Sequence, residues 1–507
     1  MHDPDVVVIG SGPNGLVAAA TLARQGLSVL VLEANAERPG GAVGSAELTA
    51  PGFVHDLGAG FFPLARLSPA FAELPVEAHG VEWCHAELES VHPALDGTSA
   101  SLVRRELRAH EAPNYFGTEA DTRIWDRLVD RHVLSQQALM KALLSPLPSI
   151  GSWLRVGFFR LLELGGSFLA SSGGLSRRWF ESEAARRVLP SLALHADLGP
   201  KDALGGAMAY VLGFSAGTVG FPVPRGGAQK LTDAVVTLLE LSGGRLRLGA
   251  RVERVLVRRG RASAVRVAGG DEIAAKHAIL ADTSPRALLL DLVGRDQAPA
   301  WAVRAARRYR AAWGTFKVDF ALQGPVPWRD EAARRSATVH LGENIDDLAR
   351  FTDEVRSGRL PERPYLVVGQ QSVADPTRAP EGRHTLYVYT HVPEPIEGGW
   401  DARREAFADR IESRIEELAP GFRSRVLARR ASAPPDLERA NPNLVGGDLG
   451  GGSNAWHQQL FFRPFFPSFR YRMPIRGLYL CSSSTHPGGG AHGMCGYNAA
   501  ARVLADL

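Results

Sequence analysis

The stretch Val6-Val-Val-Ile-Gly10-Ser-Gly12-Pro-Asn-Gly15 decides the fold of this chain. An apolar strand runs directly into a Gly-x-Gly-x-x-Gly turn that opens a helix, and Ala19 and Gly26 are small where strand and helix must approach each other. A second apolar strand, residues 27–32, ends at the acidic residue Glu33. Together these features form the fingerprint of a dinucleotide-binding βαβ unit.

Each residue of the fingerprint has a physical task. Gly10 permits the tight turn, and Gly12 lets backbone N–H groups approach a diphosphate. The helix that opens at Gly15 points its positive end at that diphosphate. Glu33 is placed to accept hydrogen bonds from the ribose hydroxyls of an adenosine. The spacing therefore favours a bound dinucleotide over a glycine-rich turn without a ligand.

Length and composition limit the classes of protein to consider. A chain of 507 residues is long for one core and predicts two domains, interleaved in the sequence. With 45% hydrophobic and 22% charged residues, the composition is typical of a soluble globular protein. The formal charge of +4 comes mostly from scattered arginines that alternate with acidic residues, so no nucleic-acid partner is indicated.

The three cysteines, Cys84, Cys481 and Cys495, form no CxxC pair and no zinc-like spacing. We therefore predict no metal site and no redox disulfide, but reduced thiols in a cytoplasmic protein. The fingerprint strand begins four residues after His2, so we expect no signal peptide.

The most apolar helical stretch covers residues 153–170. It contains Arg155, Arg160 and Glu163 and is too short to span a bilayer comfortably, so it is not a transmembrane helix. Two interpretations stay open. Its apolar residues, with Phe158 and Phe159 among them, could face the core, or they could lie on a membrane surface with the arginines beside them. A peripheral contact with a membrane is therefore part of the prediction.

Three separated blocks are expected to form one nucleotide-binding domain, residues 1–74, 222–294 and 471–507. The inserts between them, residues 75–221 and 295–470, are expected to combine into a second domain that binds the substrate. Within these blocks the patterns predict helices at 230–241 and 403–418 and strands at 278–282, 315–322 and 385–390. Helical spacing also joins Trp179, Phe180, Ala184 and Val188, and Pro434 with the glycines of 446–452 indicates a long loop.

Further motifs extend the pattern to the whole chain: Pro39-Gly-Gly41, Asp56-Leu-Gly58, Phe221-Pro-Val-Pro-Arg-Gly-Gly227, Phe462-Arg-Pro464, and the segment from Leu478 through His486-Pro-Gly-Gly-Gly490 to Gly496. With these motifs the chain resembles the FAD-dependent oxidoreductases of the phytoene desaturase and amine oxidase superfamily. Within that group it is similar to the phytoene-desaturase-like branch typified by pyridine nucleotide-disulfide oxidoreductase domain-containing protein 2.

This resemblance implies an α/β fold with an α+β substrate domain, the two-domain FAD-binding Rossmann-type fold of the glutathione-reductase and amine-oxidase kind. FAD would lie extended, with its adenosine on the first βαβ unit and its flavin ring at the C-terminal segment. The N–H groups at the start of the last helix would face the flavin. The residues implied in binding FAD are Gly10, Gly12, Pro13, Asn14, Gly15, Glu33, Ala34, Gly40, Gly41, Ala42, Gly58, Ala59, Val252, Ser484, Gly493 and Met494. Ser482 departs from the glycine of many relatives.

Two side chains are candidates for catalysis. Lys317 lies where amine oxidase relatives hold a lysine that contacts flavin N5 through water, and its alternative is a surface lysine on an edge strand. His486 lies beside the expected flavin ring and could orient the substrate or relay a proton, and its alternative is a structural bond to a loop carbonyl. His492 and Tyr497 follow close by. No GxSxG, HExxH or paired-carboxylate motif is present in the sequence.

The predicted function is FAD-dependent desaturation or dehydrogenation of a hydrophobic small molecule, such as a carotenoid or isoprenoid, by hydride transfer to flavin N5. Aromatic and aliphatic residues of the inserts suit such a substrate. The alternatives are a flavin amine oxidase, a redox-neutral flavin isomerase and a non-catalytic binding protein of the same fold. The intact fingerprint and C-terminal segment argue against the last of these.

Overall fold

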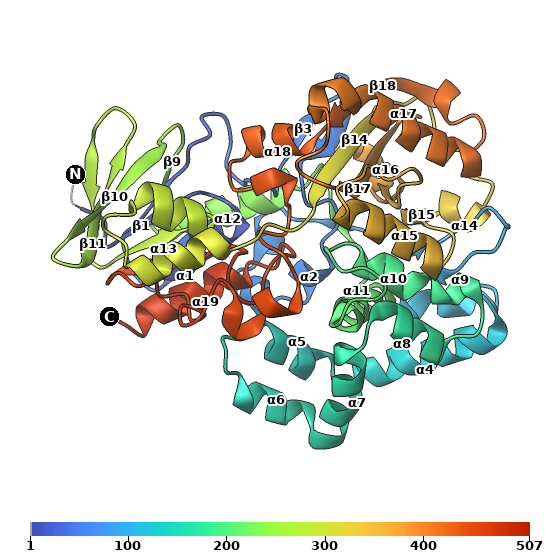
Figure 1. Cartoon of the computed structure of the whole chain (residues 1–507), viewed down its shortest axis with the longest axis horizontal. Helices are drawn as coiled ribbons and strands as arrows, with labels where there is room; N and C mark the ends of the chain where they lie inside the picture. Colours follow the sequence, from blue (N-terminus) through green and yellow to red (C-terminus); the bar gives the residue numbers. More distant parts are fainter. Residues whose placement is uncertain (1–2) are drawn as a thin grey trace.

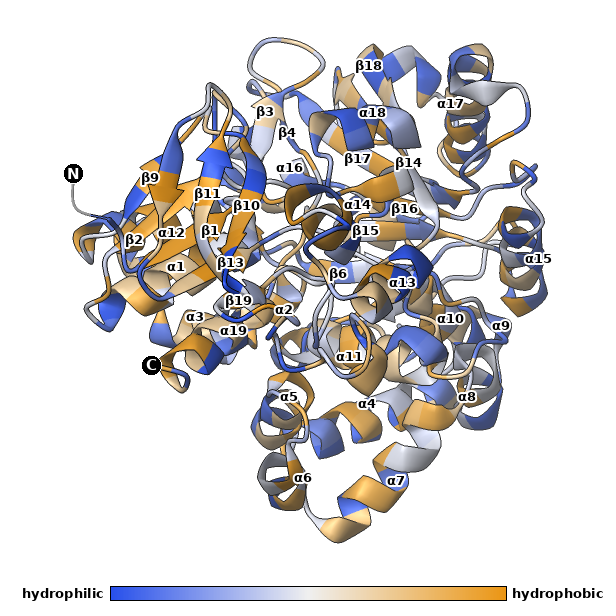
Figure 2. Cartoon of the chain, turned by 60° about the vertical axis from the view of Figure 1, so that its left-hand side comes forward, coloured by the Kyte–Doolittle hydropathy of each residue, from blue (hydrophilic) through white to orange (hydrophobic). Residues whose placement is uncertain are grey.

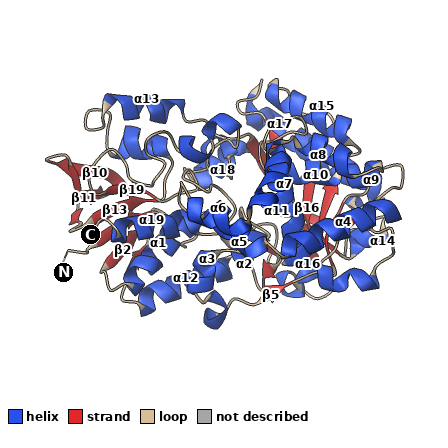
Figure 3. Cartoon of the chain, turned by 90° about the horizontal axis from the view of Figure 1, so that it is seen from below, coloured by secondary structure: helices blue, strands red, loops and turns tan. Residues whose placement is uncertain are grey.

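Two large sheets organise the computed structural model, which describes residues 3–507. Seen from below, the strands gather in two groups at opposite sides of the molecule, with helices around and between them (Figure 3). Both chain termini lie on the side of the first sheet (Figure 1). Residues 1 and 2, at the start of the predicted first block, lie outside the described residues.

The first sheet is parallel, five-stranded and covered on both faces. Because helices and a second small sheet cover these faces, its central strands are continuous apolar runs, and the side chains of β1 are at most 6% exposed. Its strands, in spatial order, are β19 (Leu478–Leu480), β13 (Ala278–Ala281), β1 (Val6–Ile9), β2 (Val29–Leu32) and β9 (Arg245–Arg247).

One face of this sheet packs against α1 (Pro13–Arg24), α12 (Gln229–Leu241) and α19 (Met494–Leu504). The other face packs against α13 (Ala300–Arg308) and an antiparallel sheet of β10 (Val252–Arg258), β11 (Arg261–Val267) and β12 (Glu272–Ala274). Segments from the beginning, middle and end of the chain thus share one layered unit.

The second sheet has seven strands and mixed direction. Its apolar face packs against the long helix α17 (Gly399–Leu418), and its other face is polar. The strands, in spatial order, are β18 (Val426–Ser432), β14 (Gly314–Leu322), β17 (His384–Val392), β16 (Leu366–Gly369), β15 (Ser336–Leu341), β6 (Leu88–Val91) and β7 (Ser101–Leu102).

Helices occupy the lower edge of the molecule in Figure 1. They share the large hydrophobic core of the second sheet, centred on side chains such as Trp125, Phe180 and Phe214. The helices are α4 (Glu119–Val133), α5 (Gln136–Leu144), α6 (Ile150–Val156), α7 (Phe158–Leu169), α8 (Ser172–Trp179), α9 (Glu183–Arg186), α10 (Val188–Ala193) and α11 (Gly205–Thr218).

The predicted α/β fold class is confirmed, and three local predictions need correction. The stretch 153–170 is two helices, because Gly157 adopts a φ of 92° between them. The spacing from Trp179 to Val188 belongs to three short helices, because Phe180 is extended and Ser182 caps a new helix. Pro434 begins α18 (Pro434–Ala440) instead of a loop, at the helical position where a missing N–H has no cost.

The predicted domain boundaries stay predictions. Strands of the first sheet lie within residues 1–74, 222–294 and 471–507, whereas strands of the second sheet come from the two inserts. One short pair crosses this division, because β5 (Trp83–Cys84) is antiparallel to β8 (Val223–Pro224). Among residues 3–507, no helix has both the length and the apolar character that a membrane crossing requires.

Candidate flavin site and polar sheet face

The glycines of the fingerprint form a cradle that larger residues would fill. Gly10 has a φ of 91°, which favours glycine. A Cβ on Gly12 would collide with the carboxyl of Asp282, and one on Gly15 would collide with the Gly10 carbonyl. Gly41 packs against this turn, because its Cβ would lie 3.4 Å from Gly12 Cα. These positions therefore require glycine, because other parts of the chain pack closely against the turn.

Two helix N-termini converge beside this cradle. A Cβ on Gly496 of α19 would collide with the Asn14 carbonyl of α1, and one on Gly493 would lie 2.7 Å from Val17. The amide oxygen of Asn14 is buried and has no hydrogen-bond partner among the described residues. Converging positive helix ends fit the diphosphate of an extended cofactor such as FAD, and the free Asn14 oxygen can accept a hydrogen bond from an N–H or O–H group of that cofactor.

Glu33 lies at the end of β2, as the fingerprint predicts. Its carboxylate accepts hydrogen bonds from the N–H groups of Ser11 and Asn35, both at 2.8 Å. Its own backbone carbonyl accepts the N–H of Ala250 at 2.7 Å, which brings the start of β10 at Val252 beside the Glu33 turn. Ala34 follows in the same turn, so the residues expected around the adenosine lie together.

The segments expected along the diphosphate and flavin are also joined. The Gly40 N–H donates to the Ser11 carbonyl at 3.0 Å, and the Ala59 N–H donates to the Ala42 carbonyl at 3.0 Å. A Cβ on Gly58 would lie 2.7 Å from that same Ala42 oxygen, so the two turns touch through their backbones.

The C-terminal segment lies beside the residues expected to bind FAD, but one of its backbone N–H groups differs from the expectation. Helix α19 begins at Met494, preceded by Gly493 at a φ of 67°. The Met494 N–H donates to Nδ1 of His492 at 3.0 Å, so it has a partner within the chain and is not free as expected. Burial lowers the pKa of His492 to about 4, which keeps its ring neutral and able to accept this bond. Ser484 donates through its hydroxyl to the Gly451 carbonyl at 2.9 Å.

Arg463, of the Phe-Arg-Pro motif, joins this segment to a neighbouring loop. The side chain is fully buried and donates to the carbonyls of Ser483 (2.8 Å), Ser453 (3.2 Å), Gly450 (3.3 Å) and Gly451 (3.4 Å). Within residues 3–507 these contacts include no carboxylate. The guanidinium therefore joins residues 450–453 to Ser483 through hydrogen bonds to their backbone carbonyls.

The polar face of the second sheet carries Lys317. In the register of β14 and β17, Lys317 lies opposite Tyr389 and Asp319 lies opposite Tyr387, so all four side chains share this face. Lys317 is 2% exposed on a strand between β18 and β17, which excludes the surface position on an edge strand. Its ammonium donates to both oxygens of Asp319 and lies 4.5 Å from the centre of the Tyr387 ring.

Burial and ion pairing have opposite effects on the ionisation of Lys317 and Asp319. Burial lowers the pKa of Lys317 and raises the pKa of Asp319, against the attraction between them. The ring of His55 lies 3.5 Å from Asp319, and burial lowers the pKa of His55 to about 3, so it is neutral. The Tyr387 hydroxyl donates to the Gly58 carbonyl at 2.5 Å. The lysine group is thus linked directly to the turn expected beside the flavin ring.

A chain of hydrogen-bonding side chains continues along the polar face. Tyr389 Oη lies 3.0 Å from His195 Nδ1, His195 Nε2 lies 2.7 Å from His340 Nε2, and His340 Nδ1 lies 2.8 Å from Ser90 Oγ. Ser90 also contacts His92 Nε2 at 3.2 Å. Burial lowers the pKa of all three histidines, so each is neutral and can both donate and accept. Tyr389 can therefore donate to a ligand or accept from one.

His486 is 6% exposed, and burial lowers its pKa to about 4. Its carbonyl accepts the Tyr471 hydroxyl at 2.9 Å, and its Nε2 has no hydrogen-bond partner within the described residues. A neutral ring does not supply a general acid at neutral pH, so a proton relay through His486 stays a prediction. Tyr497 donates to Glu73 at the surface.

Asp282 is a buried carboxyl that the sequence interpretation did not single out. It follows β13 and accepts the Gly15 N–H at 2.9 Å. Burial raises its pKa to about 7, and the nearby charge of Glu33 acts in the same direction. An ionisable group therefore lies at the helix end where the diphosphate is expected.

The residues that the sequence interpretation missed are mostly on the polar face. Tyr387, Tyr389 and His391 alternate along one strand, so a period of two could have assigned them to one face. Nothing in the sequence pairs His195 with His340, because they lie on unrelated segments.

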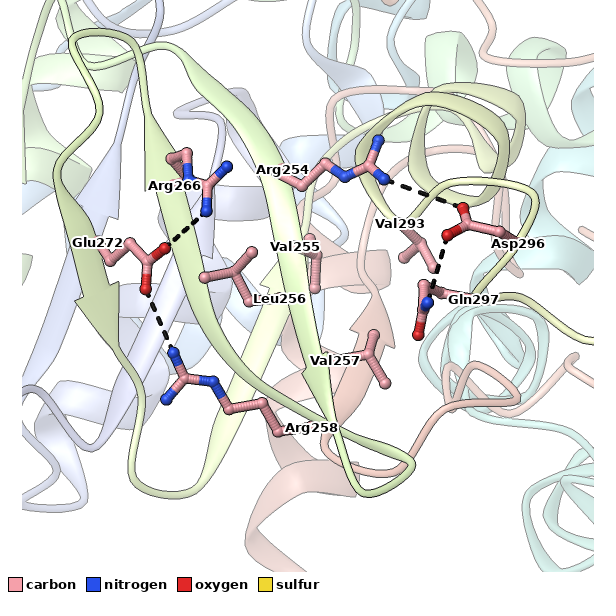
Figure 4. Close-up of a pocket in the computed structure, with 10 residues that line it drawn as sticks. All are labelled: Arg254, Val255, Leu256, Val257, Arg258, Arg266, Glu272, Val293, Asp296 and Gln297. Carbon is pink, nitrogen blue, oxygen red and sulfur yellow. Dashed lines mark hydrogen bonds and ion pairs between the residues drawn. The ribbon is translucent and has the colours of Figure 1, made fainter.

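A surface pocket of about 280 Å³ lies elsewhere, between β10–β12 and residues 293–297 (Figure 4). Its arginines already contact acidic groups, since Arg266 pairs with Glu272 at 2.7 Å and Arg254 lies 3.9 Å from Asp296. These pairings leave little charge for an anionic ligand.

The fold and the fingerprint define a dinucleotide-binding protein with two sheets. A model of the family described as flavin containing amine oxidoreductase matches residues 14–504, and the chain belongs to this family of flavin-containing oxidoreductases. The family assignment confirms the resemblance to the phytoene desaturase and amine oxidase superfamily.

Curated relatives cover nearly the whole chain. Pyridine nucleotide-disulfide oxidoreductase domain-containing protein 2 of Rattus norvegicus is 28% identical over 99% of this chain and 94% of that protein. A limonene dehydrogenase polypeptide of Castellaniella defragrans is 26% identical over 99% and 95%. Phytoene desaturase (neurosporene-forming) of Rhodobacter capsulatus is 25% identical over 97% and 91%.

Solved structures share the fold. A putrescine oxidase has a TM-score of 0.63 at 18% identity, covering 99% of both chains. An oxidoreductase from Methanosarcina mazei has a TM-score of 0.62 at 15% identity, also over 99% of both. At these identities the likeness concerns the fold alone.

Proposed function

We propose that this protein is an FAD-dependent dehydrogenase that desaturates or oxidises a hydrophobic, isoprenoid-like small molecule. The observation that carries the proposal is the link from Lys317 through Tyr387 to the Gly58 carbonyl, which ties the polar sheet face to the turn expected beside the flavin. When bound, FAD would supply the redox chemistry by accepting a hydride at N5.

Residues of this chain would bind FAD and orient the substrate. Residues of the fingerprint would hold the diphosphate, Glu33 the ribose, and the turn at Gly58 the flavin edge. Tyr389, held by His195, is half-buried and would hydrogen-bond a polar group of the substrate. The names of two relatives specify limonene and phytoene, which are isoprenoid hydrocarbons, and this supports the hydrophobic class.

The amine oxidase alternative meets an obstacle at the polar face. Aromatic rings bind ammonium groups through their faces, but the ammonium of Lys317 already lies over the Tyr387 ring at 4.5 Å. Asp319, the neighbouring carboxylate, is paired with the same lysine. An amine substrate would have to displace these contacts.

The test is the visible spectrum of the purified protein, followed by anaerobic addition of isoprenoids and of amines. Flavin bands that bleach with isoprenoids alone are expected. Bleaching with amines alone would support the amine oxidase, and turnover only after chemical reduction of the flavin would indicate the isomerase. A protein that takes up no FAD would overturn the proposal in favour of a binding protein. The cytoplasmic location belongs to the same proposal and is tested by cell fractionation.

A further inference from the structure

The outward face of α6 and α7 is unusual for a surface helix pair. Most of the exposed side chains are apolar, with exposed fractions of 82% for Phe159, 72% for Leu154, 69% for Phe158 and 62% for Leu162. Ile150 on α6 is also exposed. On α7 the exposed positions recur at helical spacing, while Leu164 is buried against the core. The helix is amphipathic, but a large part of its apolar surface points outward.

The charges around this face have one dominant sign. Residues 134–170 contain the basic side chains Lys141, Arg155 and Arg160 and a single acidic one, Glu163. Glu163 is neutralised by Arg160 at 2.8 Å and by Arg131 at 2.9 Å. Lys141 and Arg155 are exposed and make no ion pair within residues 3–507. Arg155 thus lies unpaired on α6 itself, and Lys141 lies unpaired on α5, which packs against α6.

The position of these helices agrees with a docking role. They lie at the lower edge of the molecule, and their ribbons carry much orange in the hydropathy view (Figure 2). The apolar loop around Phe461 adjoins them, because the Phe461 and Phe469 rings are 5.1 Å apart and Arg470 beside Phe469 donates to the Leu147 carbonyl between α5 and α6. Phe461 is 40% exposed.

We propose that the outward face of α6 and α7 docks on a lipid bilayer that contains anionic phospholipids. The phenylalanines and leucines would enter the boundary between headgroups and acyl chains, and Lys141 and Arg155 would contact phosphate groups. An exposed apolar surface with unpaired cations on the same and the adjoining helix matches an anionic bilayer in both properties. Docking here brings the substrate-binding half to the membrane, since α7 packs on α11 and α11 packs on α2 (Pro63–Arg66), just after the Gly58 turn.

The test uses the full chain loaded with FAD and vesicles of phosphatidylcholine, with and without phosphatidylglycerol. We expect the protein to sediment with the mixed vesicles. Phe158→Ser with Phe159→Ser should lower the partition coefficient about tenfold or more. The matched control is Leu241→Ser, because Leu241 is 71% exposed at the end of α12 on the opposite half, and it should leave binding unchanged. Lys141→Glu with Arg155→Glu should abolish the preference for anionic vesicles.

Flavin absorbance and thermal unfolding show whether each variant remains folded. Wild-type protein that stays in the supernatant, or a folded phenylalanine variant that binds as the wild type does, would overturn the proposal. Light scattering tests the alternative that a second copy of this chain covers the face. If the wild type is a dimer that binds no vesicles, and the phenylalanine variant is a monomer, the face is assigned to that second copy. Vesicle binding requires no turnover, so its outcome is independent of the substrate.

Discussion

The hydroxyl of Tyr387 donates a hydrogen bond of 2.5 Å to the backbone carbonyl of Gly58. This bond joins residues 329 positions apart and connects the polar face of the second sheet to the turn after Asp56. Asp56 itself is held by Arg378 in a fully buried pair at 3.0 Å. The turn expected beside the flavin is therefore held in place by a strand of the second sheet.

Tyr387→Phe should loosen this turn. Loss of the buried bond leaves the Gly58 carbonyl unpaired and should lower the free energy of unfolding by about 1–3 kcal/mol. Thermal unfolding with simultaneous detection of flavin release measures the effect. Tyr389→Phe is the matched control, since it keeps the Gly58 contact. Equal stability of the two variants would show that the bond does not hold the turn.

Lys317→Met should destabilise the protein by about 3–5 kcal/mol, because it leaves Asp319 buried without its partner. Adding Asp319→Asn should recover part of that loss, which urea unfolding can measure. Activity of the double variant then tests a catalytic role of Lys317 separately from its effect on stability. If it turns over and its flavin reoxidises at the wild-type rate, Lys317 has no part in the mechanism.

Glu33→Ala should weaken FAD retention by about tenfold, since the ribose loses its acceptor. Glu37→Ala in the same loop is the control, because the Glu37 side chain is exposed and accepts no hydrogen bond within residues 3–507. Flavin content after gel filtration and fluorescence titration with FAD give the readout. Unchanged retention in the Glu33 variant would remove the assigned ribose contact.

Asp282 should make FAD binding depend on pH. Its pKa is raised to about 7 from 3.8, so the folded protein loses stability as pH rises from about 4 to about 7. Above about 7 the ionised carboxylate would repel the diphosphate, and FAD affinity should fall about tenfold. Groups that face it include Glu33, Cys481 and the Gly15 N–H.

Asp282→Asn is the matched variant for this pH effect. It keeps an oxygen for the Gly15 N–H but cannot ionise, so its FAD affinity should be flat across the same range. Fluorescence titrations with FAD at several pH values measure both proteins. Parallel pH profiles would assign the dependence to another group.

Arg463→Met should lower the free energy of unfolding by about 3 kcal/mol or more, because four backbone carbonyls lose the same fully buried, charged donor. Arg476→Met is the control, since the exposed Arg476 side chain donates to one carbonyl among the described residues, that of Arg259. Urea unfolding compares the two. A loss no larger than that of the control would show that water replaces the guanidinium without cost.

Much of the first sheet could be predicted from the sequence because its signals are local. The apolar run at Val6, the glycine turn and the acidic Glu33 lie within one βαβ unit. The outward face of α7 could not be predicted, because periodicity identifies an apolar face without showing which side meets the core. The core-facing interpretation of Phe158 and Phe159 was therefore wrong.

The sequence by itself determined the dinucleotide turn and the family, because these depend on spacing within short segments. Only the tertiary structure decided that Lys317 is buried beneath Tyr387, that His195 meets His340, and that Asp282 reaches Gly15. These contacts join separate segments, up to 267 positions apart for Gly15 and Asp282. Strand register and burial create them, and neither property is encoded in local spacing.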